Sequence, residues 1–305
     1  MCNKTGGDDI RTKILPYAAA GCTVLFWSSS FPMVRYVFNY YSPESLMLFR
    51  FLVASAVLSA YCLINKVPLP SARDLPQFAA AGFLGLFLYM WAFNTGTSLV
   101  LSGVSSFIIA SSPIFTLLLS IIFLKEKANL FIWAGVIISM AGIIIIGMSQ
   151  ITGMQFNIGV IILLSAAVFT SIYSIIQKYI MRKYTVMQAT AYSVIFGTFF
   201  MLIFLPGLSR DFNVAYIHAN LMAVYLGVFP AALAYFTWGY ALSKAEKTVY
   251  VTSFLYLVPF SASVIAFFWL GEQIPSAALI GGVVVITGMV LTNAVKYKTE
   301  KTDGK

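Results

Sequence analysis

Apolar runs of about 20 residues alternate along this chain with short polar islands. A helix of about that length crosses the hydrocarbon layer of a membrane. The pattern therefore predicts an all-α membrane protein with ten transmembrane helices. The predicted helices cover residues 14–38, 44–65, 76–98, 102–124, 129–149, 157–179, 186–206, 219–242, 249–270 and 276–295.

A second pattern repeats at a constant offset of 146 residues. The first copy holds Tyr89, Pro113, Leu124, Glu126, Gly135 and Gly142, and the second holds Tyr235, Pro259, Leu270, Glu272, Gly281 and Gly288. Repetition over this length is typical of a duplicated transport unit rather than a solenoid, whose period is about 20–50 residues. We predict a first repeat over residues 1–150 and a second over 151–305. The paired glycines in each copy are expected to allow close helix packing.

The charges predict how these helices are oriented. The chain is basic, with a net charge of +9, which could also indicate a nucleic-acid partner. If the N-terminus is cytoplasmic, however, sixteen lysines and arginines fall in inside segments, and Arg210 alone falls in an outside loop, predicted at 207–218. This positive-inside asymmetry predicts that both termini are cytoplasmic and makes a nucleic-acid role unnecessary.

Five crossings in each half make the predicted repeat inverted, because an odd number of crossings turns the second copy over in the membrane. Inverted repeats are common in secondary transporters, which bind substrate near the midplane and alternate access by rocking. Some channels also have them, whereas a membrane-embedded enzyme would not need this symmetry.

The composition offers little conventional site chemistry. Sixty per cent of the residues are apolar and 10% are charged. Cys22 and Cys62 lie in apolar runs and suit small core residues, so we expect no disulfide framework, metal site or cofactor. No acidic residue falls in the middle of a predicted crossing, and the one histidine, His218, lies in an outside loop. A proton relay through a buried carboxylate and a hydrolytic site are both disfavoured.

The start of the chain carries a family resemblance. Residues 27–35 read Trp-Ser-Ser-Ser-Phe-Pro-Met-Val-Arg, and Pro43 is followed seven positions later by Arg50. These residues, with the two proline-to-glutamate spacings, resemble the EamA family of the drug/metabolite transporter superfamily. Ser28, Ser30 and Arg35 depart from the usual glycine, asparagine and lysine of that signature.

The resemblance implies a ten-helix carrier in the cell membrane, such as a bacterial inner membrane. It also implies small organic solutes as substrates, often amino acids or related amphiphilic metabolites, and often export. An importer or exchanger of another class, such as nucleotide-like solutes or drugs, stays open. A channel and a membrane-embedded enzyme are the alternatives of a different class. A monomer and a homodimer are both compatible with the sequence.

Arg50 is the most costly residue to place in a membrane, since it lies about two turns inside the second predicted helix. It could anchor a substrate carboxylate or gate the outer side. Alternatively, it could be structural, bonding helix-end carbonyls or pairing with Glu44 or Glu272. Arg35 lies nearer a helix end and could reach the lipid headgroups. Glu126 and Glu272 are predicted to be structural end-caps for the helices that follow them.

Aromatic and polar residues at helical spacing supply the remaining candidates for a substrate cavity. They could equally be core or lipid-facing residues. They are Trp27, Ser30, Phe31, Tyr89, Ser106, Thr170, Tyr173, Gln177, Tyr235, Trp238, Thr252 and Tyr256. Four prolines inside predicted crossings would act as hinges or as fixed kinks: Pro32, Pro113, Pro230 and Pro259.

Overall fold

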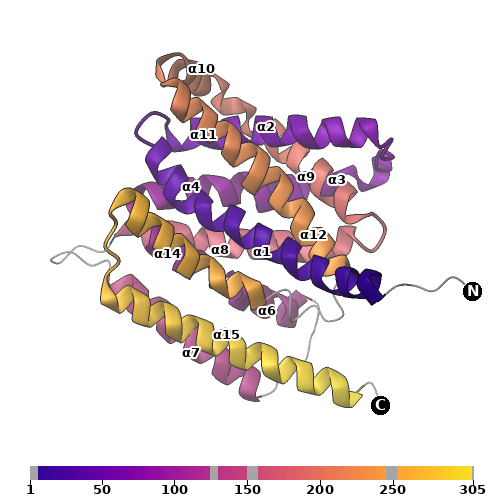
Figure 1. Ribbon diagram of the computed structural model, residues 1–305, viewed down its shortest axis with the longest axis vertical. Helices are drawn as coiled ribbons and strands as arrows, with labels where there is room; N and C mark the ends of the chain where they lie inside the picture. The colour runs from indigo at the N-terminus through magenta and orange to yellow at the C-terminus, as the bar shows by residue number, and fades with distance from the viewer. Residues whose placement is uncertain (1–5, 124–129, 150–156, 245–252, 304–305) are drawn as a thin grey trace, which may run out of the picture.

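The computed structural model describes residues 6–123, 130–149, 157–244 and 253–303. Within these ranges all regular secondary structure is helical (Figure 1). Seven helical segments of the described chain are long and apolar enough to cross a membrane, and three shorter apolar helices, Trp133–Ile146, Leu257–Leu270 and Ser276–Leu291, accompany them. The expectation of an all-α membrane protein is confirmed at this level.

The helices of the first half cover most of their predicted ranges. They are α1 (Gly6–Val37), α2 (Pro43–Ile64), α3 (Leu75–Ala80), α4 (Tyr89–Leu99), α5 (Ser102–Ile109), α6 (Ser112–Phe123) and α7 (Leu130–Met148). A short 3₁₀ turn, η1 (Ala72–Asp74), precedes α3, and a π-helical segment, η2 (Ala81–Leu88), joins α3 to α4.

The second half contains α8 (Ile158–Ile180), α9 (Val186–Met201), α10 (Leu205–Val214), α11 (Ile217–Val228), α12 (Ala234–Lys244), α14 (Leu257–Leu270) and α15 (Ser276–Asp303). Three short elements connect them, namely η3 (Leu202–Phe204), the π-helical segment η4 (Phe229–Leu233) and η5 (Ser253–Tyr256). The two π-helical segments lie at matching places in the 146-residue repeat, because η2 shifted by 146 residues covers 227–234.

Local chemistry explains where several helices begin. Ser42 caps α2 by accepting a hydrogen bond from the Ser45 N–H, and Pro43 fits the first turn because it lacks the donor that would be unsatisfied there. Thr185 and Gln188 form a capping box at the start of α9. These caps place the polar turns at the ends of the apolar helices.

Two regions differ from the expectation from sequence. The predicted crossing 102–124 is divided into α5 and α6, and Pro113 lies in the first turn of α6, where a proline is tolerated. The prediction of a loop over 207–218 is wrong for most of its length, because α10 continues to Val214 and α11, which includes His218, begins at Ile217. Leu208 of α10 is buried and α10 packs against α2, so tertiary packing favours helix over loop there.

The helices are arranged in layers (Figure 1). The pair α7 and α15 lies side by side at one end of the molecule, and α2, α10 and α11 lie at the other. Between them, α1 packs against α12 and α14, and α4 packs against α8. Helices from both halves of the sequence therefore surround the centre, where the candidate residues lie.

Candidate functional site

Four of the predicted aromatic residues meet in the centre of the bundle. The Trp27 ring of α1 lies 5.8 Å from the Tyr235 ring and 5.6 Å from the Trp238 ring, both on α12. The Tyr173 ring of α8 lies 6.5 Å from that of Tyr235. Such edge-to-face and tilted pairs are favourable and rigid. Helical spacing does not pair these particular rings, and the structure brings them into one cluster.

Trp27 is also fixed by a hydrogen bond. Its indole Nε1–H donates to the backbone carbonyl of Pro230, at 3.2 Å. Pro230 is in the π-helical segment η4, immediately before the helix that carries Tyr235 and Trp238. The indole therefore ties α1 of the first half to the irregular part of the second half.

Arg50 lies next to this cluster. Arg50 is only 2% exposed, and its guanidinium nitrogens Nε and Nη1 have no hydrogen-bond partner among the described residues. Tyr89 and Tyr235 are both within electrostatic range of its guanidinium group. A buried polar group without a partner is costly, and a buried charge is more so. The site therefore holds a buried guanidinium group whose hydrogen-bond donors are not all satisfied by the described residues.

The sequence leaves open a purely structural role for Arg50, as the ion-pair partner of Glu44 or Glu272, and the described residues form neither pair. Glu272, one of its two proposed partners, forms an ion pair with Arg35 instead. Glu44 forms no ion pair with Arg50 in the described part of the chain. Helix-end carbonyls at the end of α4 are bonded by Arg35, which lies in the last turn of α1.

The other aromatic candidates extend the cluster along α4. Phe31 of α1 is 4% exposed, and its ring meets the Phe93 ring at 5.4 Å. Phe93 in turn lies 5.9 Å from Tyr89. Through Tyr89, which is within electrostatic range of Arg50, these rings continue the aromatic surface from α1 to α4.

Several polar candidates are already hydrogen-bonded within the protein. The Gln177 Nε2–H₂ donates to Tyr173 Oη at 2.6 Å and to the carbonyl of Ala189 at 3.1 Å, which links α8 to α9. Ser30 donates to the carbonyl of Trp27 at 2.8 Å, and Ser106 to that of Gly103 at 2.5 Å. These side chains stabilise helices and orient the rings.

The remaining candidates differ in what the structure describes. Thr170 lies half-buried on α8. Thr252 and Glu126 lie outside the described residues, and Tyr256 is placed only by its backbone, as the last residue of η5. Among the prolines, Pro32 lies within the continuous helix α1, and Pro259 lies in the first turn of α14.

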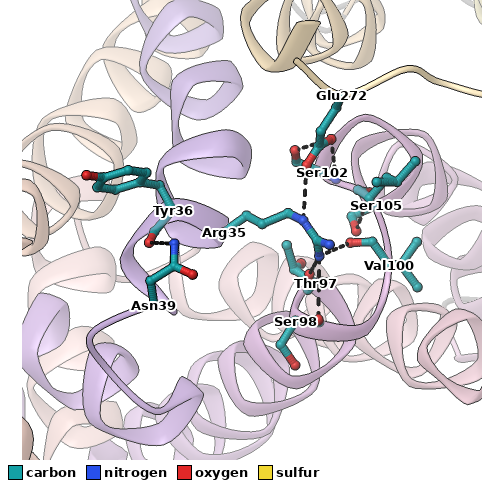
Figure 2. A network of polar contacts seen from close by, with 10 residues as sticks. Arg35, Tyr36, Asn39, Thr97, Ser98, Val100, Ser102, Ser105 and Glu272 are labelled. Carbon is teal, nitrogen blue, oxygen red and sulfur yellow. Dashed lines mark hydrogen bonds and ion pairs between the residues drawn. The ribbon is translucent and has the colours of Figure 1, made fainter. Parts of the chain in front are cut away.

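Arg35 forms a polar network that sequence reasoning missed (Figure 2). Its Nη1 donates to the carbonyls of Thr97, Ser98 and Val100 at 3.0, 3.4 and 2.9 Å. These carbonyls lie at the C-terminal end of α4, where a cation is favoured. The interpretation that Arg35 reaches the headgroups is wrong, because α4 ends beside it. The two segments are far apart in the sequence, so only the fold could show the contact.

Glu272 completes this network. Its Oε1 lies 3.1 Å from Arg35 Nε, and its Oε2 accepts hydrogen bonds from the Ser102 N–H at 2.9 Å and the Ser102 hydroxyl at 2.6 Å. Ser102 is the first residue of α5, so the carboxylate caps a helix of the first half. Among the described contacts its hydrogen bonds go to α5 and not to α15, the helix that follows it and that the sequence predicts it to cap.

A groove of 830 Å³ opens beside this network. Its lining comes from the end of α1 and from the turn between α1 and α2 (residues 38–42). Ser98, Leu101, Leu270 and Glu272 complete it. We call it the α1–α2 groove. It differs from the predicted cavity at the centre, because it lies at the ends of the helices and has Arg35 and Glu272 in its wall.

Comparison with known proteins decides the family. The family model described as "EamA-like transporter family" matches residues 15–148 and again residues 157–294. The chain belongs to the EamA-like transporter family. The resemblance found in the sequence is thereby confirmed, and the protein is a multi-pass transporter of the cell membrane.

Named relatives agree with this assignment. The EamA chain is 35% identical to "Uncharacterized transporter YdfC" of Bacillus subtilis over 275 residues, which cover 90% of each chain. It is also 35% identical to "Probable terminal-alkyne amino-acid exporter" of Streptantibioticus cattleyicolor over 271 residues, covering 89% of this chain and 91% of the relative. A solved structure titled "Crystal structure of protein" shares the fold, with a TM-score of 0.66 at 17% identity over 94% of this chain and 99% of that one.

Proposed function

We propose that this protein is a secondary carrier for a small amphiphilic metabolite with a carboxylate, such as an amino acid, and that it works by alternating access in the direction of export. The observation that carries the proposal is Arg50, a buried cation with two nitrogens that lack a partner among the described residues, beside an aromatic cluster. A carboxylate could accept a charge-assisted hydrogen bond from either of these donors, and arginine is the side chain best suited to binding carboxylates. The aromatic rings would receive the apolar part of the substrate.

The name of one relative supports the substrate class. The Streptantibioticus protein is named as a probable terminal-alkyne amino-acid exporter, and its similarity covers about nine tenths of both chains. An amino acid combines the carboxylate that Arg50 could bind with a side chain that Trp27 and Tyr235 could contact. The export direction of the proposal rests on this relative and on the family.

An inverted repeat is part of the proposal. Trp27 and Tyr173 are 146 residues apart, as are Tyr89 and Tyr235, so the cluster and its extension along α4 contain two pairs of repeat-equivalent residues. The two π-helical segments match at the same offset. Transporters with inverted repeats bind substrate where the two copies meet, commonly beside irregular helix segments.

Ten crossings are also part of the proposal. The seven long apolar segments and the three shorter ones correspond to the ten predicted runs. The strong basic asymmetry of the sequence supports cytoplasmic termini. In that orientation α1 ends at the outer surface, and the α1–α2 groove opens to the outside.

Flux measurements in liposomes test this proposal. Purified protein is reconstituted with a panel of labelled amino acids, other carboxylates and nucleotide-like solutes, and efflux is followed as a function of concentration. We expect saturable movement of at least one amino acid and faster flux when unlabelled solute is present on the opposite side. Movement that rises linearly with concentration would indicate a channel, and chemical conversion without net movement would indicate an enzyme.

A further inference from the structure

Buried polar atoms without a hydrogen-bond partner among the described residues occur on α4 and near both of its ends. Five described residues have such atoms, and four of them lie between the centre and the α1–α2 groove: Arg50, Asn94, Thr97 and Glu272. The Glu272 Oε1 is held only by its ion pair with Arg35. The fifth residue, Thr95, lies on a different face of α4 by helical spacing. Native proteins satisfy almost all buried polar groups, so each exception needs an explanation.

Helix α4 runs between Arg50 at one end of this set of residues and Glu272 at the other. It begins at Tyr89, within electrostatic range of Arg50, and it ends at the carbonyls that Arg35 binds. Asn94 and Thr97 are three residues apart on one face and are both completely buried. The Asn94 Nδ2–H₂ donates to the carbonyl of Pro43 at 2.9 Å, which fixes this face against the start of α2.

Arg35 and Glu272 form an ion pair in the wall of the α1–α2 groove, at the C-terminal end of α4 (Figure 2). The pair joins the first half of the chain to the second at this point, and the Arg35 side chain is 32% exposed while that of Glu272 is 7% exposed. Glu272 is in the non-helical connector between α14 and α15, which starts at Gly271 with a φ of +67°. A glycine adopts this conformation without strain, so the connector can carry the carboxylate across to α1.

We propose that Asn94 and Thr97 line the route by which substrate passes between Arg50 and the α1–α2 groove, and that the Arg35–Glu272 pair is its gate. The proposal rests on the proposed function, since a route is needed only if Arg50 binds a transported solute. In the closed state the pair holds α1, the α4–α5 corner and the 271–275 connector together. When the pair separates, the polar atoms of Asn94 and Thr97 become accessible to water and to the polar groups of the substrate.

Thiol labelling tests the route without requiring any transported solute. Thr97→Cys is placed in a background with Cys2, Cys22 and Cys62 replaced by alanine, with and without Glu272→Gln. The probe is the membrane-impermeant reagent methanethiosulfonate ethylsulfonate, applied to right-side-out and to inside-out vesicles. We expect Glu272→Gln to raise the labelling rate of Thr97→Cys at least tenfold, and only from the side opposite to the N-terminus.

The matched control is Thr95→Cys in the same two backgrounds. Its labelling should not change, because Thr95 lies off the proposed route. An unchanged rate at Thr97→Cys would overturn the proposal, and an equal rise at Thr95→Cys would overturn it by showing general loosening. Should Glu272→Gln fail to insert, Arg35→Lys weakens the same pair and is judged by the same two outcomes. Failure of the flux assay with normal gated labelling would remove the proposed substrate but keep the gate.

Discussion

Gly142 of α7 and Gly281 of α15 lie face to face, so that a Cβ atom built on either would lie 2.6 or 2.8 Å from the other's carbonyl oxygen. Seven residues further along α15, a Cβ atom built on Gly288 would likewise contact the carbonyl oxygen of Gly135 on α7. Each contact is the repeat equivalent of the other, because 135 corresponds to 281 and 142 to 288. Small residues let two helix backbones approach closely, and the resulting van der Waals packing favours helix association in lipid.

Gly142→Ala should therefore destabilise the protein, although alanine is the better helix former by about 1 kcal/mol. The methyl group meets backbone atoms of α15, so the helices must separate, at a cost of roughly 1–3 kcal/mol. The free energy of unfolding in detergent measures the effect. Gly21→Ala on α1 is the control, because nothing lies within 4 Å of the position that its methyl group would take, and it should be neutral or stabilising. Equal effects of the two substitutions would show that the glycine contact is unimportant.

Trp27→Phe tests the hydrogen bond at the centre. The change keeps an aromatic ring beside Tyr235 but removes the donor to the Pro230 carbonyl. Leaving a buried carbonyl unpaired costs about 1–3 kcal/mol, and we expect a loss of stability in that range together with a higher KM for transport. Trp133→Phe is the control, since Trp133 on α7 is 43% exposed. Wild-type stability and KM in Trp27→Phe would contradict the tie between α1 and η4.

The connector between α8 and α9 supplies a prediction about pH. Lys183 Nζ lies 2.5 Å from Asp74 Oδ2, and this hydrogen bond with the carboxylate raises the pKa of Lys183 above its ordinary value. A raised pKa means that the contact stabilises fully below the unfolded lysine pKa of about 10.4, as long as Asp74 is ionised, and is lost as the pH rises through the folded value.

Lys183→Met should accordingly lower the melting temperature by the same amount at pH 6 and pH 8. The difference from the wild type should shrink only when the pH exceeds about 10.4. Arg182→Met removes an adjacent exposed charge and should have a smaller effect. A difference that disappears between pH 6 and pH 8 would mean that another group, and not Lys183, controls the contact.

The helices could be predicted well from the sequence because burial in lipid imposes a long apolar run that needs no knowledge of tertiary contacts. The glycine pairs were predictable for a second local reason, because their spacing places both glycines of a helix on one face. The Arg35 network was not predictable, because it depends on which helix end the guanidinium meets. The helix α10 was also missed, since its stability comes from packing on α2 and its sequence includes the turn-like segment Pro206–Gly207.

The candidate site was predictable as a set of residues but not as an arrangement. Trp27, Tyr173, Tyr235 and Trp238 are all candidates by helical spacing, and they do meet. Gln177 and Ser30 are candidates on the same grounds, yet their polar groups bond within the protein. Spacing identifies the face of a helix, whereas hydrogen-bond partners come from neighbouring helices that the pattern does not specify.

The most direct test of the central claim is the flux of an amino acid and of its carboxamide analogue through wild type, Arg50→Lys and Arg50→Gln in liposomes. A hydrogen bond to a charged group contributes about 1.5–3 kcal/mol, which corresponds to roughly 10- to 100-fold in affinity. We expect Arg50→Gln to lose that factor for the amino acid, Arg50→Lys to retain part of it, and the carboxamide to distinguish little between the variants. Wild-type flux of the amino acid through correctly inserted Arg50→Gln would contradict the claim that Arg50 binds the carboxylate.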